Sequence, residues 1–132
     1  MRVIPSKTHT IIGVLVGIIL IVAPWLLGFS DEPTATRVAI IVGAFILVNE
    51  LITTSPASPL KLIPMRVHLV LDVLTGIFLA ASPWLFGFAD EETNAWLPHL
   101  VVGILVAGYA LMTNPTDARD RRDDTTTAAA RR

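Results

Sequence analysis

The sequence contains no cysteine and almost no net charge. Without thiols the chain has no disulfide bonds and no thiolate metal ligands, although the redox compartment stays undecided. Ten Lys and Arg against eleven Asp and Glu give a formal net charge of −1, which offers no support for nucleic-acid binding. The chain also lacks a nucleophile–base arrangement, a phosphate-binding glycine loop and a cofactor fingerprint. We therefore expect no enzyme activity, no cofactor and no nucleic-acid partner.

Charged side chains are also missing from long stretches. Of the 132 residues 53% are hydrophobic and the mean hydropathy is +0.66, which is high for a soluble domain. Residues 11–29 contain no charged side chain, and this length spans a hydrocarbon core of roughly 30 Å as a helix. A secretory signal peptide is the alternative interpretation, because Arg2 and Lys7 precede the stretch. The stretch is long for that purpose, lacks a clear cleavage site, and has a counterpart deep inside the chain.

A six-residue phrase occurs twice, at residues 24–29 (PWLLGF) and 83–88 (PWLFGF), and is followed each time by an acidic pair. Proline breaks the regular helical hydrogen bonds, and glycine favours the left-handed conformation that ends a helix. We interpret each phrase as the outer end of a membrane helix, with its aromatic side chains in the interfacial belt. The residues of this motif are Pro24, Trp25, Gly28, Phe29, Asp31, Ser82, Pro83, Trp84, Gly87, Phe88 and Asp90.

The duplication extends beyond the phrase. At an offset of 59 Gly17 matches Gly76, and at an offset of 60 Thr53 matches Thr113. The tripeptide Ser82-Pro83-Trp84 resembles the signature of the SPW-repeat integral membrane proteins of prokaryotes, with Ala23 replacing the serine in the first copy. The resemblance implies a four-helix membrane protein of two hairpins. It carries over no activity and no catalytic residue.

The expected fold is all-α, with four transmembrane helices in two tandem hairpins that form a parallel internal repeat. The first repeat covers 1–54, with helices at about 11–29 and 34–53. A proline-rich linker covers 55–64, and the second repeat covers 65–114, with helices at about 65–88 and 95–113. Residues 115–132 are expected to be a disordered charged tail.

The basic residues predict the orientation. All but Arg37 lie in or beside the N-terminal lead, the linker and the tail. By the positive-inside rule, which here depends mainly on Lys7, Lys61 and Arg66, both termini and the linker face the cytoplasm. We therefore expect a multi-pass protein of a prokaryotic plasma (inner) membrane.

Five polar side chains interrupt the cytoplasmic ends of these helices: His9, Asn49, Glu50, His68 and Asp72. His68 and Asp72 are four residues apart and share a helix face, so they can pair. Asp72 can also pair with Arg66, or become neutral by taking a proton. The set is either a satisfied polar cluster that fixes helix register or a proton- or cation-linked site, with Asp72 and Glu50 as the titrating groups. A metal site from these side chains is chemically allowed, but no spacing motif supports one.

Small residues four apart occur in every expected helix: Gly13 and Gly17, Ala39 and Gly43, Gly76 and Ala80, Gly103 and Ala107. Such pairs allow close helix packing, either inside the bundle or in a homo-oligomer. The tryptophans are expected in an interfacial belt, or alternatively in a ligand-stacking pocket. His99, beside Pro98, is expected to be an interfacial side chain.

The sequence favours a structural or accessory protein that packs with itself or with another membrane protein in the lipid bilayer. The alternative is a small proton- or cation-linked transporter or channel-like protein that uses the cytoplasmic carboxylates. Ion flux in liposomes distinguishes the two.

Overall fold

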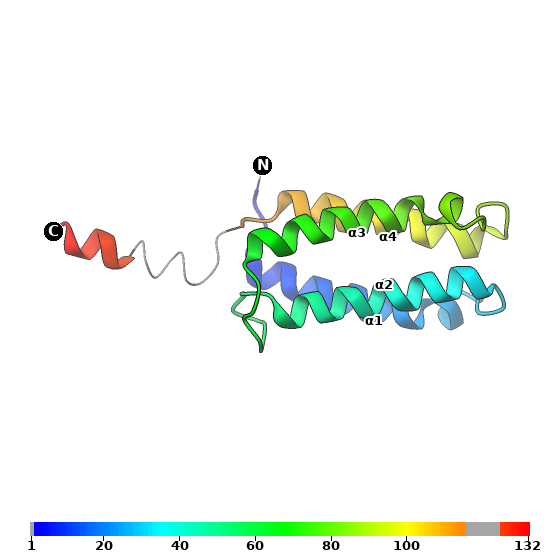
Figure 1. Ribbon diagram of the computed structural model, residues 1–132, viewed down its shortest axis with the longest axis horizontal. Helices are drawn as coiled ribbons and strands as arrows, with labels where there is room; N and C mark the ends of the chain where they lie inside the picture. Colours follow the sequence, from blue (N-terminus) through cyan, green and yellow to red (C-terminus); the bar gives the residue numbers. More distant parts are fainter. Residues whose placement is uncertain (1, 116–124) are drawn as a thin grey trace.

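Four long helices form two hairpins in the computed structural model, which describes residues 2–115 and 125–132 (Figure 1). Each helix has 20 or 21 residues, so each is about 30 Å long at 1.5 Å per residue. All four are long and apolar enough to cross a membrane. Their bounds are α1, Ser6–Leu26; α2, Pro33–Ile52; α3, Met65–Leu85; and α4, Thr93–Met112.

The main helix contacts are α1 with α2 and α3 with α4, and the two hairpins lie side by side. The N-terminus, the linker between α2 and α3 and the end of α4 lie at one end of the bundle (Figure 1). The two short connections within the hairpins lie at the other end. We call these the linker end and the loop end.

Glycine lets the helices of each hairpin approach closely. A Cβ built on Gly43 would lie 2.7 Å from the carbonyl oxygen of Gly17, and one on Gly103 would lie 2.4 Å from the backbone nitrogen of Ala80. Real Cβ atoms do not approach backbone this closely, so a larger residue would force the helices apart. A Cβ on Gly76 would lie 2.6 Å from the backbone nitrogen of Ala107. The predicted small residue Ala39 lies on α2.

Both helices that carry the repeated phrase end two residues before its glycine. Gly28 has φ +76° and Gly87 has φ +74°, and both lie in the left-handed region that the sequence predicts. The N–H of Phe29 donates to the carbonyl of Pro24, and the N–H of Phe88 donates to that of Pro83, both at 2.8 Å. These bonds belong to a Schellman motif. α1 and α3 therefore end at Leu26 and Leu85, three residues before the predicted ends.

The serine of the Ser-Pro-Trp sequence has a local structural role. Pro83 has no N–H to donate to the carbonyl of Leu79, four residues earlier in the helix. The Ser82 hydroxyl donates to that carbonyl instead, at 2.6 Å. In the first repeat Ala23 occupies the matching buried position and has no hydroxyl for the carbonyl of Leu20.

α1 begins at Ser6, five residues before its predicted start at 11. The prediction followed the apolar run and left out a polar first turn. Ser6, His9 and Thr10 of this segment are buried, whereas Lys7 and Thr8 are exposed. Just before this turn, the N–H of Ile4 donates to the carbonyl of Met112 at 3.1 Å. At the corresponding place in the other repeat, the N–H of Ile63 donates to the carbonyl of Ile52 at 3.0 Å. The two short bridges connect the hairpins at the linker end.

The apolar core follows the duplication. Leu20 and Leu79 occupy matching positions, as do Ile46 and Val106, and all four are buried in the same core. Large aliphatic side chains on the outer helix faces are exposed, as expected for surfaces in contact with lipid.

The predicted disordered tail lies partly outside the described residues, which omit 116–124. Beyond this gap, residues 125–130 form a short exposed helix, so the prediction of disorder is wrong for this segment.

A buried histidine–carboxylate cluster as the candidate functional site

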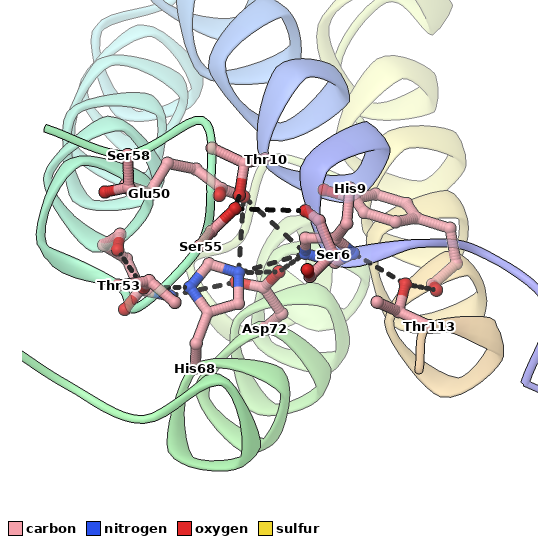
Figure 2. Close-up of polar contacts among 12 residues, drawn as sticks. Ser6, His9, Thr10, Glu50, Thr53, Ser55, Ser58, His68, Asp72 and Thr113 are labelled. Carbon is pink, nitrogen blue, oxygen red and sulfur yellow. Dashed lines mark hydrogen bonds and ion pairs between the residues drawn. The ribbon is translucent and has the colours of Figure 1, made fainter. Parts of the chain in front are cut away.

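The structure brings together the five polar side chains that interrupt the apolar helices. His9 comes from α1, Asn49 and Glu50 from α2, and His68 and Asp72 from α3. All five are buried, with at most 3% of their surface exposed. At the linker end, His9, Glu50, His68 and Asp72 point toward one another between the helices (Figure 2), and the Asn49 amide contacts Asp72.

The two imidazole rings and the two carboxylates form a compact group, which we call the four-residue cluster (His9, Glu50, His68 and Asp72). His9 Nε2 lies 2.8 Å from Asp72 Oδ2 and 3.0 Å from His68 Nε2. His68 Nε2 lies 3.1 Å from Asp72 Oδ2 and 3.3 Å from Glu50 Oε1. One ligand atom from each of the four residues lies within 4.8 Å of the other three.

Two threonines hold the far sides of the imidazole rings. Thr53 Oγ1 lies 2.6 Å from His68 Nδ1, and Thr113 Oγ1 lies 2.7 Å from His9 Nδ1. Each hydroxyl donates to the carbonyl four residues earlier, that of Asn49 for Thr53 and that of Tyr109 for Thr113. Sequence reasoning did not assign these threonines to the site. The available signal in the sequence was that Thr53 and Thr113 occupy matching positions of the two repeats.

The histidine–threonine pairs cross between the repeats. His9 of the first repeat contacts Thr113 of the second, and His68 of the second contacts Thr53 of the first (Figure 2). The duplication thus gives the site a pseudo-two-fold arrangement of imidazoles. Each repeat contains only half of each pair, so the cluster requires both hairpins.

The carboxylates break this symmetry. Asp72 matches Gly13 in the duplication, and Glu50 matches Ala110. Glu50 occupies the space that Gly13 leaves free, because a Cβ on Gly13 would lie 1.8 Å from Glu50 Oε1. Asn49 and its counterpart Tyr109 also differ. Asn49 donates to Asp72 Oδ1 at 3.1 Å, whereas the Tyr109 ring contacts the His9 ring at a tilt, with ring centres 4.6 Å apart.

Polar groups of α1 and the linker cover the cluster on one side (Figure 2). Thr10 Oγ1 donates to Ser55 Oγ at 2.8 Å. Ser58 is buried as well, and the Lys61 ammonium donates to the carbonyls of Ser55 and Ser58 at 2.7 and 2.9 Å. The linker is therefore an ordered part of the site.

Glu50 differs from the other members. It is completely buried, and neither of its carboxylate oxygens has a hydrogen-bond partner. Its Oε1 lies 3.3 and 3.6 Å from the two Nε2 atoms without forming a hydrogen bond. A buried carboxylate without a donor is costly unless a cation or a proton neutralises it. The cluster therefore has the composition and the unmet charge of a cation site.

His99 lies elsewhere, and its prediction as an interfacial side chain is wrong. It is 1% exposed and lies between the rings of Phe29 and Phe88, at 5.6 and 4.8 Å. Its Nδ1 is 2.7 Å from the carbonyl of Ala95, and its Nε2 is 3.0 Å from that of Ala35. His99 thus connects α4 to α2 at the loop end.

The repeated aromatic residues divide into two groups. Trp25 and Trp84 are exposed, and the ring of Trp84 contacts that of Trp96 at a tilt of 59°, with ring centres 6.3 Å apart. Phe29 and Phe88 are buried core residues, so the placement of Phe29 in an interfacial belt is wrong. Asp31 and Asp90 lie exposed in the connections within the hairpins. The Asn94 amide links the first turn of α4 to the end of α1 by donating to the carbonyls of Leu27 and Gly28 at 2.9 and 3.2 Å.

Comparison with known proteins identifies a family. No curated protein and no solved structure matches the chain. A family model described as the SPW repeat domain matches residues 7–113, which include all four helices except the first residue of α1 and every member of the four-residue cluster. The chain therefore belongs to the SPW repeat family.

Proposed function

We propose that the protein is a small cation-linked membrane protein, a transporter or channel-like protein whose four-residue cluster takes up a cation, either a proton or a metal ion. The observation that carries this proposal is the burial of Glu50 without a hydrogen-bond partner. A cluster that only fixed helix register would be expected to satisfy its own polar groups, because each unsatisfied buried group costs stability. Asp72 and Glu50 attract the cation, and the proposal includes no chemical reaction.

The charge distribution supports a cytoplasmic location for the site. Arg2, Lys7, Lys61 and Arg66 lie in or beside the segments at the linker end, whereas the loop end holds Asp31, Glu32 and residues 90–92, which are all acidic. By the positive-inside rule, the linker end and both termini face the cytoplasm of a prokaryotic inner membrane. A reporter active only in the cytoplasm, fused after Arg132, should be active. A fusion active only outside the cell contradicts this orientation.

Flux in liposomes tests the cation-linked function. The purified protein should conduct protons or a metal cation faster than empty liposomes, measured with a dye sensitive to pH or to the metal. Asp72→Asn and Glu50→Gln should abolish the difference because each removes a charge that attracts the cation. Glu32→Gln, an acidic residue at the loop end, is the control and should leave flux unchanged. Parent protein that conducts no faster than empty liposomes contradicts the proposal.

An accessory role is the second candidate, supported by the outer surface. A groove of ≈ 350 Å³ runs between α2 and α3 and is lined almost entirely by apolar side chains, among them Ile41, Phe45, Leu74 and Phe78. Such a groove fits side chains of another membrane helix, from a second copy or from a different protein. Crosslinking in native membranes from a photoreactive residue at position 45, followed by mass spectrometry, tests this role. A reproducible protein partner supports it, and crosslinks to lipid alone contradict it.

A further inference from the structure

We propose that the four-residue cluster is a binding site for one divalent transition-metal ion of the zinc class, held by His9 Nε2, His68 Nε2 and one oxygen each from Glu50 and Asp72. This inference deepens the proposed function, on which it rests, by naming the cation. The four side chains come from three helices and both repeats, so only the folded bundle assembles the site.

The threonine contacts determine which nitrogen of each neutral histidine carries a lone pair. A hydroxyl has one hydrogen, and those of Thr53 and Thr113 are used in bonds to the carbonyls of Asn49 and Tyr109. The threonine oxygens must therefore accept from His68 Nδ1 and His9 Nδ1, which carry the N–H. A neutral imidazole has a single N–H, so both Nε2 atoms present lone pairs to the cluster. A metal-bound histidine is oriented in the same way, with its second nitrogen donating to a fixed partner.

The charges of the cluster favour a divalent ion. Glu50 and Asp72 contribute two negative charges, and no Lys or Arg within residues 2–115 and 125–132 forms an ion pair with either. Protonating both histidines would balance the charge, but the two Nε2 atoms are 3.0 Å apart and would then direct two N–H groups toward each other. One divalent ion neutralises both carboxylates and accepts both nitrogen lone pairs at once.

The spacing of the ligand atoms fits tetrahedral coordination. Zinc binds histidine nitrogen and carboxylate oxygen at about 2.0–2.2 Å, which places ligands of a tetrahedron about 3.3–3.6 Å from one another. Five of the ligand separations in the cluster lie between 2.8 and 3.6 Å. Accepting the ion requires changes of about half an ångström or less in these five separations, and an adjustment of the two carboxylate oxygens, which lie within 4.8 Å of each other.

Glu50 supplies an independent observation. It is completely buried, both of its oxygens lack a hydrogen-bond partner, and Oε1 points into the group. Asn49 already fixes the other oxygen of Asp72 through a bond to Oδ1. Asp72 is thus oriented by the protein through its other oxygen, whereas Glu50 has no protein donor on either oxygen and depends on the metal.

The donor set distinguishes between classes of metal. Two imidazole nitrogens and two carboxylate oxygens suit zinc and its first-row neighbours. Magnesium prefers six ligands, mostly oxygens and waters, and calcium takes six to eight oxygens. We therefore expect zinc to bind, Co²⁺ to substitute for it, and neither magnesium nor calcium to compete.

The full chain, purified in detergent and dialysed against a chelator, provides the test. Zinc titrated by calorimetry should bind at one ion per chain, and Co²⁺ should produce the intense visible absorption of a tetrahedral nitrogen–oxygen site. Glu50→Gln and Asp72→Asn should each weaken zinc binding at least tenfold, and His9→Ala with His68→Ala should abolish it. Thr53→Val, which touches no metal, should weaken binding about 10- to 100-fold by freeing the His68 ring.

Controls separate binding from misfolding. Asp31→Asn and Glu32→Gln change acidic residues at the loop end and should bind zinc as the parent does. Circular dichroism and gel filtration of each variant show whether the bundle is intact. Parent protein that binds less than one tenth of an equivalent, or zinc binding that survives both carboxylate substitutions, overturns the metal site.

The experiments can contradict the metal site and the cation-linked function independently of each other. If the carboxylate variants abolish proton flux but the parent binds no zinc, the proposed function stands and the metal assignment is wrong. If the parent binds one zinc through the cluster but conducts no cation in liposomes, the metal site stands and the transport function is wrong.

Discussion

Glu50 Oε1 occupies the place where a side chain on Gly13 would begin, because a Cβ on Gly13 would lie 1.8 Å from this oxygen. Glycine at position 13 is thus a condition for a buried carboxylate on the neighbouring helix. At the matching position of the second repeat the residue is Asp72, which contributes its own carboxylate. The duplication has therefore diverged at two pairs of positions, Gly13/Asp72 and Glu50/Ala110, and each repeat supplies one carboxylate.

Gly13→Ala should therefore displace Glu50 and destabilise the bundle. Forcing a methyl group into a packed site costs about 1–3 kcal/mol. Unfolding in mixed detergent micelles should show this loss, together with weaker zinc binding. Gly108→Ala is the matched control, since a Cβ there meets nothing within 4 Å and alanine favours a helix by about 0.5–1 kcal/mol. Equal stability changes in the two variants contradict the proposed packing.

Ser82→Ala should destabilise the second hairpin by about 1 kcal/mol, because the carbonyl of Leu79 loses the hydroxyl that replaces the missing N–H of Pro83. Ala23→Ser adds the same hydroxyl to the first repeat, where Pro24 has no N–H to donate to the carbonyl of Leu20, and should stabilise the protein by a similar amount. Thermal unfolding in detergent measures both variants. A neutral Ser82→Ala would show that this hydroxyl does not contribute to stability.

Thr53→Val should change which ring nitrogen of neutral His68 carries the hydrogen, and should leave the tautomer of His9 unchanged. Both imidazoles are expected in the Nδ1–H form at a pH where they are neutral, because each Nδ1 faces a threonine oxygen that must accept. Nitrogen NMR spectra of histidine-labelled protein distinguish the two neutral forms. Thr113→Val should affect His9 instead. Nε2–H signals from both histidines in the parent protein would contradict the assignment.

His99→Leu should destabilise the protein by about 1–3 kcal/mol, because it removes a buried imidazole whose ring nitrogens contact the carbonyls of Ala35 and Ala95, to one of which a neutral ring donates. The loss should appear as easier separation of α4 from α2 in hydrogen-exchange measurements of the loop end. Val101→Ala, on the exposed face of the same helix, is the control and should have little effect. Similar exchange rates in His99→Leu and the parent would show that His99 does not hold these helices together.

The helical hairpins could be predicted from the sequence, because the apolar runs and the repeated Pro-Trp phrase recur at a nearly constant offset. It also selected the five polar residues of the site, since a charged or imidazole side chain inside an apolar helix is conspicuous. The threonines were missed because a threonine at a helix end is ordinary, and only the fold shows that its hydroxyl faces the other repeat. His99 was misplaced because its buried position depends on Phe29 and Phe88, which come from two other segments of the chain.

Glu32 provides a prediction for the dependence of stability on pH. The pKa of its carboxyl is raised above the ordinary value of 4.5, first by loss of hydration and then by the negative charge of Glu91 in the other repeat. The folded protein therefore binds this proton more tightly than the unfolded chain. The resulting stabilisation is fully present below pH 4.5 and is lost as the pH rises through the raised pKa. Glu32→Gln should flatten the decline in melting temperature over this window, whereas a decline identical to that of the parent would mean that the Glu32–Glu91 repulsion does not affect folding.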